Sequence, residues 1–217
     1  MEVLFWMATV IPVIGAGGIL HFRLKAALQG RWNILPKCLA TWMAVCTALA
    51  GILRNKGEEQ TGMILAALIL FLLADALLEL QFFAGMAVFA AGHLLLIIWF
   101  AGRGHHTGWN VLLWALLLAA SVWVFRKELS RGKEHPGLYL MILYPAVLMA
   151  MVSMALTMPF MLGAEYLWAA AGAVLFGISD LMVGKGFFKK LPGRLDFLAL
   201  AMYYCGIFCL GMITWAV

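Results

Sequence analysis

The sequence contains eight apolar segments, each near the length of about 20 residues that a helix needs to cross a bilayer. They cover residues 3–20, 33–53, 61–80, 82–101, 109–125, 137–157, 163–184 and 195–216. In the hydrocarbon core only helices and closed barrels satisfy all of their backbone polar groups. We therefore predict an all-α, polytopic membrane protein with about eight transmembrane helices, which form a single domain over residues 1–217.

Two boundaries between these segments depend on single features. Residues 61–101 are almost continuously apolar, and we place a break at their most polar point, Glu79-Leu80-Gln81. Residues 137–184 are too long for one crossing, and we place a break at Met158-Pro159 because proline disrupts the interior of a helix.

The charged residues are few and lie mainly between the segments. Only 12% of the 217 residues are charged and 65% are hydrophobic, whereas soluble domains have about a quarter charged and about half apolar. Eleven of the 15 Lys and Arg residues fall on one side of the predicted membrane. The positive-inside rule makes that side cytoplasmic and places both termini outside a cell membrane. The net charge of +5 thus has an explanation without nucleic acid, and we expect no such partner.

Several ionisable or polar side chains lie inside the apolar segments, where an Asp costs about 2.5–3.5 kcal/mol. They are Lys37, Asp75, Glu79, His93 and Asp180, with Tyr144, Ser179, Tyr203 and Tyr204 as polar neighbours. Most of them share the cytoplasmic half of the predicted membrane. We therefore expect a polar cavity that opens to the cytoplasm or the inner leaflet.

These residues also have structural interpretations. The two aspartates and His93 could bond to neighbouring helices, and Lys37 could extend to the lipid headgroups. Glu79 could be interfacial and solvated, although its i+4 spacing puts it on the face of Asp75. Tyr203 and Tyr204 point to different sides of a helix, so we expect only one of them to face the cavity.

An internal repeat is suggested by two stretches around the aspartates. "LFLLADALL" and "LFGISDLMV" share the pattern Leu-Phe-x-x-small-Asp, with Asp75 and Asp180 at the same place in each. The match relates the third segment to the seventh and indicates a four-plus-four duplication. Chance similarity between apolar helices is the alternative.

The chain resembles the lysoplasmalogenase (YhhN-like) family along nearly its whole length. The matching stretches are "LPKCLAT", "LFLLADALL", "FFAGMAVFAAGHLLL", "GAVLFGISDLM" and "MYYCG". The resemblance implies an eight-helix hydrolase that cleaves the vinyl ether bond of lysoplasmalogens into a fatty aldehyde and a glycerophospho-alcohol. The chain has Ala74, Leu96, Val183 and Ile207 where the family usually has Gly, Tyr, Leu and Gln.

Vinyl ether hydrolysis requires a proton on the β-carbon and a water molecule that attacks the resulting cation. Two carboxyl groups in a poorly hydrated cavity suit both tasks. We therefore expect Asp75, Asp180 and His93 to be catalytic, without deciding which Asp is the acid. We expect the lysophospholipid substrate to contact Lys37, Tyr144, Ser179, Tyr203 and Tyr204.

No cofactor and no metal are expected. The sequence has no CxxC pair, and zinc sites usually need three or four ligands, whereas His93 is the one histidine that we place near mid-membrane. Three other classes stay open. They are a proton-coupled transporter of a small amphipathic solute, another membrane lipid hydrolase and a scaffold. The sequence does not indicate the oligomeric state, the headgroup or the chain length of the substrate.

Overall fold

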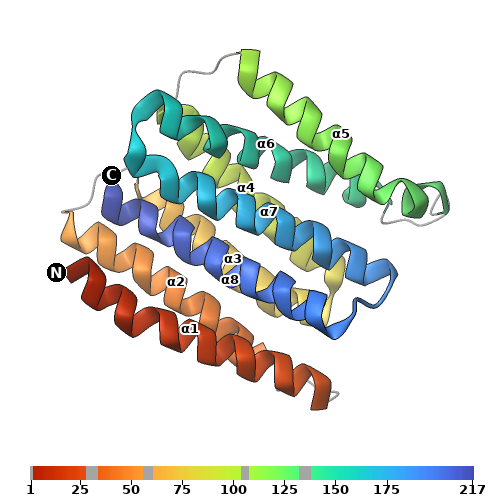
Figure 1. Cartoon of the computed structure of the whole chain (residues 1–217), viewed down its shortest axis with the longest axis horizontal. Helices are drawn as coiled ribbons and strands as arrows, with labels where there is room; N and C mark the ends of the chain where they lie inside the picture. The colour runs from red at the N-terminus through yellow and green to blue at the C-terminus, as the bar shows by residue number, and fades with distance from the viewer. Residues whose placement is uncertain (1, 28–33, 56–60, 104–107, 132–137) are drawn as a thin grey trace.

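The computed structural model describes residues 2–27, 34–55, 61–103, 108–131 and 138–217 (Figure 1). Within these ranges the chain forms eight long helices and a short 3-10 helix. They are α1 (Glu2–Ala27), α2 (Ile34–Arg54), α3 (Gly62–Leu80), α4 (Phe82–Arg103), α5 (Gly108–Arg131), α6 (Leu138–Leu162), η3 (Ala164–Tyr166), α7 (Leu167–Phe188) and α8 (Gly193–Ala216). Each of the eight is long and apolar enough to cross a membrane, which confirms the predicted fold class.

The break between α3 and α4 lies where the sequence places it. Gln81 has an extended backbone (φ −150°, ψ 103°) and separates the two helices. The break at Met158-Pro159, in contrast, is wrong, because α6 continues through Pro159 to Leu162. A proline removes one backbone hydrogen bond, which a packed transmembrane helix tolerates. The chain reverses at Gly163, whose φ of 129° lies in a region that favours glycine.

Helix α7 is longer than the sequence predicts. It extends four residues past the predicted end, to Phe188. Asp180 therefore lies eight residues from the end of its helix, about 12 Å along the axis, whereas Asp75 lies five residues, or about 7.5 Å, from the end of α3. From the segment bounds in the sequence we expect the two aspartates to lie at similar distances from the ends of their helices, and the longer α7 corrects that expectation.

The packing of the helices follows a four-plus-four arrangement. In the first half α1 packs on α2, α2 on α3 and α3 on α4, and the second half repeats this order from α5 to α8. The largest contacts between the halves are two equivalent ones, α2 with α8 and α4 with α6. Figure 1 shows α1 and α5 at opposite edges of the bundle, with both termini at the same end. This arrangement agrees with the duplication that the two aspartate stretches indicate.

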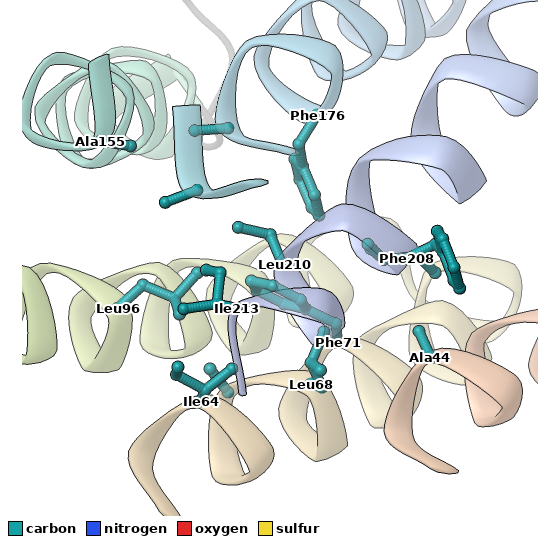
Figure 2. Close-up of a cluster of buried hydrophobic side chains, with 14 of the residues drawn as sticks. Ala44, Ile64, Leu68, Phe71, Leu96, Ala155, Phe176, Phe208, Leu210 and Ile213 are labelled. Carbon is teal, nitrogen blue, oxygen red and sulfur yellow. The ribbon is translucent and has the colours of Figure 1, made fainter. Parts of the chain in front are cut away.

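The core lies where α3, α4, α7 and α8 meet. Phe71, Leu96, Phe176, Leu210 and Ile213 are fully buried there and approach one another from these four helices (Figure 2). The outer helices α1 and α5 expose many large apolar side chains instead, as expected of helices that face lipid. Buried polar groups near this core are therefore held by a rigid, close-packed setting.

Two glycines let α7 and α8 approach closely. A Cβ on Gly172 would lie 2.9 Å from the Gly206 carbonyl oxygen, and one on Gly206 would lie 2.9 Å from the Phe176 nitrogen. Both contacts are to backbone atoms, which cannot move aside as a flexible side chain can. Small residues at helix interfaces are the usual way in which membrane helices reach such distances.

We expect Gly172→Ala to lower the free energy of unfolding by about 1–2 kcal/mol because it overpacks this contact. Titration with SDS, followed by circular dichroism, measures the change. Gly102→Ala is the matched control, since a Cβ there meets nothing within 4 Å and the alanine favours the helix. Equal unfolding of the two variants would contradict the role of Gly172.

Candidate functional site

The polar residues inside the bundle form two clusters. We call His93, Tyr144 and Asp180 the groove cluster, since two of them line a groove described below. Lys37, Thr41, Asp75, Glu79 and Tyr203 form the ion-pair cluster. Each cluster joins three helices, α4, α6 and α7 in the first and α2, α3 and α8 in the second.

The groove cluster is a line of three hydrogen-bonding groups. The Tyr144 hydroxyl donates to the Asp180 carboxylate, and its oxygen lies 3.3 Å from His93 Nε2. His93 is fully buried and packs against the rings of Phe71 and Phe176, whose centroids lie 5.0 and 4.8 Å from its own. Asp180 and Tyr144 are only partly buried. A molecule in the groove can therefore reach the carboxylate, with the histidine behind it.

The groove lies at the end of the bundle opposite the two termini. It encloses about 690 Å³, including its open mouth, and is lined mainly by apolar side chains. Its lining comprises Leu78, Phe82, Met86, Phe89, Phe125, Leu129, Pro145, Leu148, Leu181, Val183, Gly184, Phe187 and Phe188, with Glu128, Tyr144 and Asp180 as the polar members. A mostly apolar cleft with a few polar groups suits an amphipathic ligand.

The ion-pair cluster is buried apart from Glu79, which is exposed near the end of α3. Lys37 Nζ lies 3.3 Å from Asp75 Oδ1 and 3.4 Å from Glu79 Oε1. Tyr203 donates its hydroxyl to Asp75 Oδ2 over 2.6 Å, and Thr41 donates to the same oxygen. Asp75 is 1% exposed. Lys37 therefore binds two carboxylates and does not extend to the headgroups, and Glu79 is a member of the cluster.

The two aspartates do not share the groove. Asp75 is absent from the lining of the groove. The ring of Phe176 contacts both clusters, because its centroid lies 5.3 Å from that of Tyr203 and 4.8 Å from that of His93. The single cavity lined by both carboxyl groups, which the sequence led us to expect, is thus replaced by two clusters with aromatic rings between them. Only Asp180 faces the groove.

Ser179 and Tyr204 lie outside both clusters. Ser179 is fully buried and donates its hydroxyl to the Ala199 carbonyl oxygen over 2.7 Å, which links α7 to α8. Tyr204 is 4% exposed, and its buried hydroxyl has no hydrogen-bond partner among the residues that the structure describes. Of the two adjacent tyrosines only Tyr203 reaches a carboxylate, and neither of them lines the groove.

The sequence alone does not single out three further residues near the site, Thr41, Glu128 and Lys185. Thr41 lies one helical turn after Lys37, so i+4 spacing could have linked it to the lysine. Glu128 and Lys185 form an ion pair of 2.8 Å between α5 and α7. No sequence signal relates these two, because their contact depends on how the helices pack. In the described ranges, no three His, Cys, Asp or Glu side chains are placed to hold a metal ion.

Comparison with known proteins places the chain in a family. The model of the YhhN family matches residues 32–213, which include both clusters and the groove. No curated protein and no solved structure matches the chain. Leu96 and Ile207, which depart from the usual pattern, are fully buried and lie outside the groove lining. Because the match covers most of the sequence, the chain belongs to the YhhN family.

Proposed function

We propose that this protein is a membrane-embedded hydrolase that cleaves the vinyl ether bond of lysoplasmalogens to a fatty aldehyde and a glycerophospho-alcohol. The observation that carries the proposal is a half-buried carboxyl group, Asp180, held by Tyr144 in an apolar groove. Such a groove suits a lipid chain, and the carboxyl group suits proton transfer to it. Membership of the YhhN family supports the same class of substrate.

A single residue that first gives and then takes a proton can carry out the reaction. Asp180 gives its proton to the β-carbon of the vinyl ether, and the electron pair of the double bond forms the new C–H bond. The α-carbon becomes an oxocarbenium ion, which water attacks while the Asp180 carboxylate takes the water proton. The hemiacetal then breaks its bond to the glycerol oxygen, which gains the hydroxyl proton, and the aldehyde leaves.

The surroundings of the two aspartates support this assignment. Asp75 has Lys37 as a partner, whereas Asp180 has no ion pair among the described residues. Apolar surroundings disfavour an unpaired charge, so Asp180 is suited to hold a proton and Asp75 to stay charged. Because Asp75 does not reach the groove, we assign it a positioning role. Lys37 is engaged by carboxylates, so we do not assign it the contact with the substrate that the sequence predicts.

His93 and Tyr144 complete the proposed site. Tyr144 fixes the orientation of the carboxyl group, and His93, 3.3 Å from the tyrosine hydroxyl oxygen, holds that hydroxyl in position. Ser179, Tyr203 and Tyr204 contact protein groups away from the groove, and we assign them to packing.

The proposal is tested with lysolipids that differ only in a vinyl ether, alkyl ether or ester linkage. We expect aldehyde from the vinyl ether alone. In D₂O, aldehyde trapped as it forms is expected to carry one deuterium on the carbon next to the carbonyl, because that carbon receives the proton. Release of fatty acid from the ester, or absence of aldehyde, would contradict the proposal.

A further inference from the structure

An ion pair lies at the mouth of the groove. Glu128 Oε1 on α5 and Lys185 Nζ on α7 are 2.8 Å apart, with 19% and 31% of the two side chains exposed. Glu128 lines the groove, and Lys185 follows its lining residue Gly184. Lys185 also lies over the Phe125 ring, 5.1 Å from its centroid. The pair thus links α5 to α7 beside the groove, and the Phe125 ring adds a second contact to Lys185.

This pair is incompletely satisfied. Glu128 Oε2 is buried and has no hydrogen-bond partner among the residues that the structure describes. A buried carboxylate oxygen without a donor is costly and requires an explanation. Lys185, for its part, has three N–H donors and uses one of them on Glu128. Together they offer an acceptor for a cation beside donors for an anion.

The surroundings of the pair fit a small zwitterion at the end of a lipid. The rings of Phe82 and Phe187 stack at 4.2 Å beside the mouth and provide apolar walls. Lys185 follows Asp180 by five residues, which is about 7.5 Å along α7. A glycerophosphate unit spans a similar distance between the vinyl ether at Asp180 and the phosphate of the headgroup.

We propose that Glu128 and Lys185 form the headgroup subsite and select a lysolipid with a primary ammonium, as in phosphoethanolamine. Glu128 Oε2 accepts a hydrogen bond from the ammonium, and Lys185 Nζ donates to the phosphate. A trimethylammonium group has no N–H to offer and leaves Oε2 without a donor. This inference rests on the proposed function for the orientation of the lipid in the groove.

The test measures binding of alkyl ether lysolipids, which are not vinyl ethers, to the full chain in detergent by calorimetry. We expect the ethanolamine form to bind about tenfold more tightly than the choline form or the bare phosphate, because its hydrogen bond is charge-assisted. Glu128→Gln should abolish this preference and leave affinity for the bare phosphate unchanged. Glu165→Gln, at an exposed position outside the groove, is the matched control.

Two results would overturn the subsite. One is equal affinity of the wild type for the three headgroups, and the other is a preference that persists in Glu128→Gln. Tight binding of soluble glycerophosphoethanolamine, which has no chain, would overturn the assignment to a lipid. Because the probes are not cleaved, these results stay separate from the assay of aldehyde release, and failure of the proposed reaction would show only in that assay.

Discussion

Asp180→Asn is expected to lower the rate of aldehyde release from a lysoplasmalogen by about 1,000-fold, within the range by which general acid–base groups accelerate reactions. The amide accepts a hydrogen bond from Tyr144 as the carboxylate does, so the groove keeps its shape. It cannot give a proton to the β-carbon or take one from water. The loss should therefore appear in kcat, with KM changed by less than about threefold.

Two further variants make this experiment specific. Tyr144→Phe removes the hydrogen bond that orients Asp180 and leaves the carboxyl group in place, so we expect a smaller loss of about 10- to 100-fold. Glu165→Gln changes an acid outside the groove and should keep the wild-type rate. All variants are compared at equal amounts of monodisperse protein. A near-normal rate in Asp180→Asn would remove Asp180 from the proposed mechanism.

The number and class of the helices follow from the sequence because the bilayer imposes a length on them. An apolar stretch of sufficient length forms a helix whatever its neighbours are. Gln81 also ends α3 as predicted. Pro159 misled the prediction, since the cost of one lost hydrogen bond is small beside the packing of α6. The chain turns from α6 into the next element at Gly163, whose φ is positive, and not at Pro159.

The sequence predicts which polar residues belong to the site better than it predicts which of them contact one another. Asp75, Asp180 and His93 stand out in a sequence because charge and polarity are costly in lipid. Which of them meet depends on the rotation of each helix, which nearly uniform apolar segments do not reveal. Phe176 looks like any core residue in the sequence, yet it contacts both clusters. Glu128 and Lys185 lie near helix ends, where charged residues are common and carry no signal.

The ion-pair cluster gives the second large effect. Asp75→Asn leaves the buried Lys37 with Glu79 as its remaining partner at 3.4 Å. Removal of one member of a buried ion pair typically costs about 3–5 kcal/mol, and the contact with Glu79 should hold the loss near about 3 kcal/mol. Unfolding in SDS measures it. Lys37→Gln in the same chain removes the second charge, and we expect this double variant to regain most of the lost stability.

The double variant also decides how Asp75 acts. Asp75 is buried in contact with Lys37, Thr41 and Tyr203 and does not line the groove. Its effect on the reaction should therefore pass through the positions of α2, α3 and α8, which these contacts hold together. We therefore expect Asp75→Asn alone to lose both stability and kcat, and Lys37→Gln to restore both. A carboxylate that itself activated water would behave otherwise, because no change at Lys37 replaces it. A stable double variant that still lost about 1,000-fold in kcat would make Asp75 a catalytic partner of Asp180.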